Sequence, residues 1–252
     1  MRLGSYYALH RSDPDIKLQA RQLIEKALQL DPSYAIAWVM LGWIHQQYVD
    51  VASLASDAAS DIRRSFNQHA ISLQSLNAKS LNQKNWLSEA EVLLSQNREW
   101  LRVEKRDLEG WVSAFANAPY RTPLFETNVR LNEQAEIIQA CQRAKRFNGP
   151  AYSRTYFVPQ SSGVGFEVME MCLPIVEHSI TIGYSVLTYS LQEILFAQLG
   201  ETYGRRNEIS FVEPDGTRLA VHGTLPRSKR LFTATQLMDL PGNTLMLRMD
   251  GR

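Results

Sequence analysis

The sequence predicts an α+β fold, in which a helical N-terminal segment and a long helix precede antiparallel sheet. No Gly or Pro occurs from Leu54 to Leu94, and apolar residues recur there at nearly helical steps. Residues 164–176 and 180–189 are instead rich in Val, Ile, Phe, Tyr and Thr, and the polar turn Glu177–Ser179 separates them. An Asp-Gly turn later joins two more alternating runs, which predicts a second hairpin.

The first residues predict paired helices. The run Ile24 to Pro32 is similar to the second helix of a tetratricopeptide repeat, with Ala20, Ile24, Ala27 and Pro32 at its offsets. Trp38, Leu41 and Gly42 restart the pattern, which fails after Gln47. About one and a half repeats are fewer than the roughly three that a self-sufficient solenoid needs. Residues 1–50 are therefore expected to form partial tetratricopeptide-like helices with an unburied face.

Residues 51–97 are predicted to form a long amphipathic helical segment, with one slip in its pattern near Asn77–Asn85. Its apolar stripe is interpreted mainly as core. A sharper hypothesis is a homodimer through this helix, with a polar seam at Gln68, Gln74, Asn77 and Gln83.

Residues 98–199 are predicted to form one sheet domain. Its expected elements are a hairpin of Trp100–Arg106 and Trp111–Phe115, a helix from Asn128 to Phe147 that Gly149-Pro150 ends, and three further strands. Ser190 is the expected N-cap of a helix over residues 191–199. Residues 200–252 are predicted to form a second, partial sheet domain, with strands near 208–213, 218–222, 231–237 and 244–249.

Roughly residues 60–252 resemble the extracytoplasmic sensor region of bacterial two-component histidine kinases, in particular the group similar to four-carbon dicarboxylate sensors. The resemblance rests on the order of several short segments: Trp100–Asp107, Glu109-Gly110, Trp111–Phe115, Tyr156-Phe157, Gly165–Glu167, Cys172–Ile175, Gly183-Tyr184 and Thr188–Leu191. It implies a PDC-type PAS-like domain over 98–199 and a second, partial PAS-like domain over 200–252. The implied function is a ligand-sensing input module that binds a small organic acid and relays a conformational change. An alternative class is a protein–protein interaction scaffold that uses the tetratricopeptide-like helices.

Candidate ligand-binding residues are those that would give hydroxyl groups and a guanidinium to a carboxylate: Tyr152, Ser153, Arg154, Tyr156, Tyr184 and Thr188. Strand alternation would group Tyr152, Arg154 and Tyr156 on one face. A second interpretation stays open, in which Arg154 pairs with Glu167 or Glu170 and the tyrosines pack in the sheet.

Composition excludes several classes. A net charge of +1 and two short basic runs, Arg102–Arg106 and Arg227–Arg230, argue against nucleic acid as a partner, and the runs are interpreted as solvated strand and loop charge. No catalytic or kinase motif, cofactor motif or metal-ligand spacing occurs, so no enzyme activity, cofactor or metal is expected. Cys141 and Cys172 are interpreted as two buried or half-buried thiols, with a disulfide as the alternative.

No stretch reaches the roughly 18 apolar residues of a membrane span, and Met1–Asp15 lacks the apolar region of a signal peptide. The resemblance nevertheless implies a periplasmic location between two membrane helices. The chain is therefore expected to be a truncated piece, a rearranged or fused one, or a soluble relative.

Overall fold

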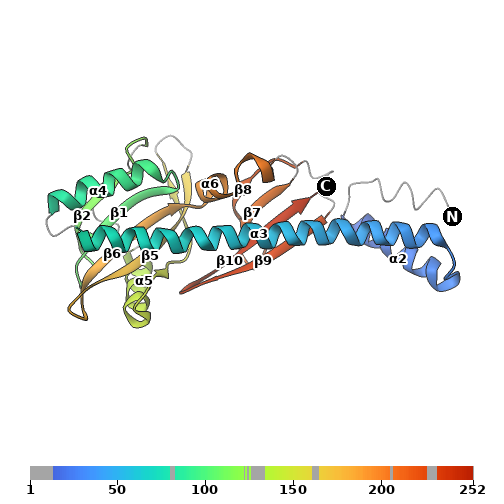
Figure 1. Cartoon of the computed structure of the whole chain (residues 1–252), viewed down its shortest axis with the longest axis horizontal. Coiled ribbons are helices and arrows are strands. Elements are labelled where there is room, and N and C mark those ends of the chain that lie inside the picture. Colours follow the sequence, from blue (N-terminus) through green and yellow to red (C-terminus); the bar gives the residue numbers. More distant parts are fainter. Residues whose placement is uncertain are drawn as a thin grey trace. The chain divides into compact units, whose positions relative to one another are not determined.

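The structure is a computed structural model that describes residues 14–79, 83–121, 123, 125, 134–160, 165–204, 207–225 and 232–251. Contacts divide the chain into two compact units, which are treated separately below. The larger unit holds residues 61–198 and 238–245. The smaller holds residues 1–60, 199–237 and 246–252. Helices and antiparallel sheets together confirm the α+β fold (Figure 1).

The larger unit contains a six-stranded sheet in the order β2-β1-β6-β5-β3, with β4 also paired to β5. Its strands are β1 (Trp100–Arg106), β2 (Val112–Asn117), β3 (Ala151–Tyr152), β4 (Tyr156–Pro159), β5 (Gly165–Glu177) and β6 (Ile180–Ser190). The structure adds a strand to the predicted five because the chain leaves β3 at Ser153 and returns to β5 as β4. All of the pairings given for these strands are antiparallel.

The long β5–β6 hairpin confirms the strands predicted at residues 164–176 and 180–189. His178 and Ser179 both adopt positive φ, 48° and 67°, as a two-residue turn between twisted strands requires. The alternation of the two strands then fixes which side chains share a face of the sheet. Glu170 pairs with Thr188, and Cys172 pairs with Val186.

One face of this sheet packs on α3 (Ala35–Lys79), and we call it the α3 face. The ring of Phe66 lies 5.6 Å from Tyr152 and 5.3 Å from Tyr189, and His69 lies edge-on to Trp100 at 5.2 Å. The Ser185 hydroxyl donates to Asn77 Oδ1 at 2.7 Å. Asn77 therefore contacts the sheet of its own chain, whereas the predicted polar seam would place it against a partner helix.

The opposite face is covered in part by α5 (Gln134–Phe147), and we call it the α5 face. Buried residues of α5 and the sheet form one apolar cluster: Ile137, Ala140, Cys141, Ala144, Ala151, Cys172, Tyr184 and Val186. Within it, Cys141 and Cys172 form a disulfide between helix and strand. The interpretation as two thiols was wrong, because the crossing of α5 over β5 brings the two Cα atoms to 5.1 Å, within disulfide range.

The helix α4 (Gln83–Gln96) contacts β1 and β2 and buries Trp86, Ala90 and Leu94. At the end of β6, the Ser190 hydroxyl accepts the backbone N–H of Glu193, at 3.3 Å, which confirms Ser190 as the N-cap of α6 (Leu191–Gly204). The predicted helix start at Asn128 lies outside the described residues.

The smaller unit contains a four-stranded sheet in the order β8-β7-β10-β9. Its strands are β7 (Glu208–Val212), β8 (Arg218–His222), β9 (Phe232–Leu240) and β10 (Asn243–Gly251). The Asp-Gly turn between β7 and β8 confirms the predicted hairpin, and Gly216 adopts φ 88° there. The tip of the β9–β10 hairpin belongs to the larger unit, where the Pro241 carbonyl accepts the Tyr152 N–H at 2.7 Å.

The N-terminal helices do not support a tetratricopeptide repeat. Helix α2 (Pro14–Leu30) pairs with the start of α3 through Ile24, Leu28 and Ala37. A repeat would turn after one short helix, whereas α3 runs unbroken for 45 residues because no Pro interrupts it. Among the described residues, no helix is long and apolar enough to cross a membrane.

Candidate functional site

A row of charged side chains lies buried on the α5 face of the larger sheet. Arg102, Glu104 and Arg106 alternate along β1 with apolar Leu101 and Val103, and all three are at most 2% exposed. Residues two apart on a strand share a face, so the row follows directly from the sequence of β1. Arg102 pairs with Thr188 and Arg106 with Tyr184 on the neighbouring β6.

Glu104 holds the row together. Its Oε1 accepts from Arg102 Nε at 2.7 Å, and its Oε2 accepts from Arg106 Nε at 2.8 Å and forms an ion pair with Arg106 Nη2 at 2.7 Å. Arg102 also donates to Asn117 Oδ1 at 3.1 Å and lies 4.0 Å from the centroid of the Phe115 ring. One carboxylate thus faces two guanidinium groups, and the triad has a formal charge of +1.

A second buried carboxylate lies two strands away. Glu170 of β5 is 1% exposed and accepts the Thr188 hydroxyl at 2.9 Å. Since Thr188 is in register with both Arg102 and Glu170, this negative charge lies nearer the Arg102 end of the row than the Arg106 end.

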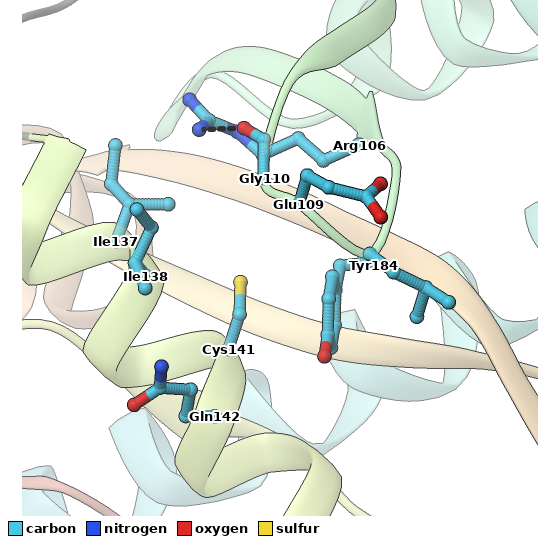
Figure 2. Close-up of a pocket in the computed structure, with 9 residues that line it drawn as sticks. Arg106, Glu109, Gly110, Ile137, Ile138, Cys141, Gln142 and Tyr184 are labelled. Atoms are coloured by element: carbon cyan, nitrogen blue, oxygen red, sulfur yellow. Dashed lines mark hydrogen bonds between the residues drawn. The ribbon is translucent and has the colours of Figure 1, made fainter.

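A pocket of about 40 Å³ adjoins Arg106. In Figure 2 the β1–β2 turn, with Glu109 and Gly110, lies on one side and α5 on the other. Its lining residues come from β1, the turn, α5 and β6: Arg106, Leu108, Glu109, Gly110, Ile137, Ile138, Cys141, Gln142 and Tyr184. Arg106 Nη1 donates to the Gly110 carbonyl at 2.8 Å, which holds the guanidinium at the wall.

The pocket suits a small polar group. By volume it admits on the order of three water molecules, or one carboxylate with a short stem. Burial raises the pKa of Tyr184, so its phenol stays protonated at neutral pH and is able to donate. Polar groups of Arg106, Glu109, Gln142 and Tyr184 line the pocket beside apolar Ile137, a mixed lining that is common in small-molecule sites.

The structure separates the six residues predicted from sequence. Tyr152 is buried on the α3 face, and Arg154 is exposed. Ser153 is buried between the strands, where its hydroxyl accepts the Glu170 N–H at 3.0 Å and donates to the Arg154 carbonyl at 2.8 Å. The break between β3 and β4 removes the strict alternation that grouped Tyr152, Arg154 and Tyr156 on one face.

The other three predicted residues lie on the α5 face. Tyr156 packs beside Leu101, Val158 and Val168. Thr188 is bonded to Glu170, and Tyr184 alone lines the pocket. Glu170 is buried, and its described partner is the Thr188 hydroxyl.

Sequence reasoning missed the charged row. The run Arg102–Arg106 was interpreted as solvated charge, and this was wrong for Arg102, Glu104 and Arg106. The available signal was the alternation of Arg102 and Glu104 with apolar Leu101 and Val103 at the start of the strand, although Lys105 breaks this pattern before Arg106. The second run, Arg227–Arg230, lies outside the described residues. In the described part of the chain no group of three or more His, Cys, Asp or Glu could hold a metal ion.

Solved structures share this architecture. The ligand-binding domain of the Pseudomonas aeruginosa amino acid chemoreceptor PctC, in complex with GABA, matches with a TM-score of 0.53 and 13% identity, over 82% of this chain and 100% of that one. The ligand-binding domain of the Pseudomonas fluorescens chemoreceptor CtaA, in complex with L-valine, matches with a TM-score of 0.53 and 14% identity, over 82% of this chain and 98% of that one. The extracellular domain of vpHK1S-Z8, which is named as a histidine kinase, matches with a TM-score of 0.55 and 11% identity, over 82% of this chain and 92% of that one.

These matches establish the fold: the chain has the PDC/PAS-like architecture of extracellular sensor domains from chemoreceptors and histidine kinases. No protein-family model and no curated protein matches the sequence.

Proposed function

We propose that this chain is a non-enzymatic, ligand-sensing input module of a bacterial two-component histidine kinase, and that it binds a small ligand through a carboxylate at Arg106. The observation that carries the proposal is a buried cation at the wall of a pocket, on the sheet face opposite α3. The similar chemoreceptor domains are named with GABA and L-valine, and both ligands carry a carboxylate. The dicarboxylates implied by the sequence resemblance share this group.

The energetics support a binding role for the row. Moving two guanidinium groups and a carboxylate out of water costs several kcal/mol per ion, and mutual attraction returns this only with good geometry. Apolar residues of similar volume would often be as stable, so a buried row of charge is weak evidence for stability. A ligand carboxylate would bring a second negative charge to a triad of net charge +1.

The position of β1 supports a relay to α3. Strand β1 carries Arg102 and Arg106 on the α5 face, while Val103 lies on the α3 face, as alternation requires. Ligand-dependent movement of β1 would therefore reach α3, which continues into the smaller unit. Such a movement can shift a conformational equilibrium only by the difference in ligand affinity between the two states.

The test is calorimetric titration of the chain with succinate, malate, GABA and L-valine. Arg106→Ala is expected to weaken the ligand that binds by about 2 to 4 kcal/mol, and Arg106→Lys to recover only part, since an ammonium lacks the bidentate fork. Arg154→Ala is the matched control, because it removes an exposed arginine and should leave affinity within about 0.5 kcal/mol. Thermal melts without ligand identify a variant that has lost its fold.

The outcomes separate the ligand classes. Binding of succinate or malate alone assigns a dicarboxylate, and binding of GABA or L-valine alone assigns an amino acid. A scaffold would be indifferent to all four acids, and the absence of stabilisation by any of them at millimolar concentration would contradict the proposal. A loss of binding in Arg154→Ala, with Arg106→Ala unchanged, would move the site to Arg154.

The disulfide agrees with the location that the sequence resemblance implies. Disulfides persist in oxidising compartments such as the bacterial periplasm. Cys141–Cys172 is buried beneath α5, next to the proposed pocket.

A further inference from the structure

The end of the β9–β10 hairpin is held inside the larger unit. Residues 238–245, which we call the hairpin tip, belong to the larger unit, whereas the other residues of β9 and β10 belong to the smaller one. Met238, Leu240 and Leu245 of the tip are 0%, 7% and 2% exposed. The ends of hairpins normally lie at the surface, so the burial of this one requires an explanation.

Two elements of the larger unit bind the tip through hydrogen bonds. The Tyr152 N–H of β3 donates to the Pro241 carbonyl at 2.7 Å, and Arg143 Nη1 of α5 donates to the Gly242 carbonyl at 3.1 Å. Strand β3 lies at one end of the strand order of the larger sheet. The tip therefore covers a sheet edge and accepts a backbone N–H that this edge presents.

The turn of the tip depends on these contacts. Its two residues are Pro241 and Gly242. Two-residue hairpins favour turns with positive φ at the first position, whereas proline fixes φ at about −65° there. Gly242 has a φ of 96°, and a Cβ there would lie 2.8 Å from the Tyr152 carbonyl oxygen and 3.2 Å from Arg143 Cδ. The turn is thus not one that a hairpin favours by itself, and its close approach to β3 requires glycine.

Helix α5 connects the tip to the pocket. Gln142 lines the pocket, and the next residue, Arg143, holds the tip. Consecutive residues of a helix point about 100° apart, so α5 presents one side to the pocket and another to the tip. Gln139 Oε1 accepts from Arg143 Nη2 at 3.4 Å, which ties the guanidinium to its own helix. A displacement of α5 at the pocket would therefore also displace the donor to Gly242.

We propose that the hairpin tip regulates the Arg106 pocket: the docked tip holds α5 in the position that binds ligand, and bound ligand strengthens the docking of the tip. This inference rests on the function proposed above. The two effects express one coupling free energy, so they are equal in size. Because the turn is unfavourable by itself, release of the tip costs little, and a ligand is able to shift the equilibrium between docked and released tip.

The covalent chain carries the state of the tip further. Strands β9 and β10 both run from the tip into residues of the smaller unit, where β10 pairs with β7 from Met246 to Asp250. Release of the tip would remove its anchor at β3 and α5, and the two strands would then be constrained only within the smaller unit.

Hydrogen exchange of the full chain without ligand tests the docking. In Arg143→Ala, the Tyr152 amide and the amides of the tip should exchange at least about tenfold faster than in the parent, since local opening sets their rate. Arg146→Ala is the matched control, because it removes an exposed arginine from the last turn of α5 and should leave these rates unchanged. Amides of the β7–β8 turn should keep their rates in both variants, which distinguishes release of the tip from general unfolding.

Gly242→Ala perturbs the tip itself, and residue 242 does not line the pocket. It should speed exchange in the tip and weaken, by at least about fivefold, whichever of succinate, malate, GABA and L-valine binds the parent. Gly216→Ala is its matched control: Gly216 has a similar φ of 88° in the β7–β8 turn, but a Cβ there would meet nothing within 4 Å. It should leave tip exchange and ligand affinity unchanged. Thermal melts identify a variant that has lost its fold.

The outcomes separate the docking, the regulation and the proposed function. Unchanged tip exchange in both Arg143→Ala and Gly242→Ala would overturn the docking, whether or not an acid binds. Faster tip exchange with unchanged ligand affinity would overturn the regulation and leave the binding role of the pocket intact. A parent that binds none of the four acids would contradict the proposed function and the regulation with it, while the exchange rates would still decide whether α5 holds the tip.

Discussion

Reduction of the Cys141–Cys172 disulfide should destabilise the larger unit by about 3.7 kcal/mol. The two residues are separated by 31 positions, and the chain-entropy model assigns this value to a closed loop of that length. The bond also fixes α5 to β5 within a buried cluster, so its loss should loosen the wall of the pocket that Cys141 lines. Ligand affinity should fall together with stability.

Urea unfolding followed by tryptophan fluorescence is a suitable assay, because Trp86 and Trp100 of the larger unit are at most 1% exposed and report its opening. The midpoint should fall on reduction, and the m-value should rise as the unfolded chain expands. The variant Cys141→Ala/Cys172→Ala is the control, since its midpoint should equal that of the reduced protein and should not change when reductant is added. Coincident midpoints of oxidised and reduced protein would refute the reasoning.

Three further outcomes are expected. Ser190→Ala removes the N-cap of α6 and should lower the free energy of unfolding in urea by about 1 kcal/mol. Ser190→Asp retains a capping side chain and should lose only a small part of this free energy. Burial raises the pKa of Tyr189 well above its usual value of about 10, so stability should be complete below about pH 10 and fall above it, and thermal melts across this range should show a smaller loss for Tyr189→Phe. Gly183→Ala would place a Cβ 2.5 Å from the Arg106 carbonyl oxygen and should cost about 2 kcal/mol or more, with weaker ligand binding; an unchanged melting temperature would contradict so close an approach of the two strands.

Local patterns were sufficient for the hairpins. The Glu177–Ser179 and Asp215-Gly216 turns, and the runs beside them, predicted β5 to β8 because turn chemistry and side-chain period act over a few residues. The N-cap at Ser190 followed from the same kind of signal. The α+β class was therefore readable from the sequence.

The site was less predictable, because it depends on which strands become neighbours. Cys141 and Cys172 meet only when α5 crosses β5, and no spacing along the chain reports that crossing. Arg106 and Tyr184 share a pocket because β1 pairs with β6, which lies far along the chain, in a register that short-range patterns do not specify. Only the alternation of Arg102, Glu104 and Arg106 was visible locally, and the usual exposure of charged residues argued against burying it.

Strand β1 connects the two roles proposed for the larger unit, which are ligand binding and relay of a conformational change. Its arginines face the pocket, and the segment that leads into it holds Glu99, which pairs with His69 of α3 at 3.1 Å, and Trp100, which packs on the same imidazole. A ligand that contacted only α5 could change the pocket without altering these contacts. A ligand held by Arg106 would act instead on β1, the strand that packs against α3. A difference in ligand affinity between two positions of β1 would then change the contacts of His69, because Arg106 and Trp100 lie on the same strand. The placement of the buried cation on β1, rather than on the helix that covers it, would make the proposed binding site also suitable for signalling.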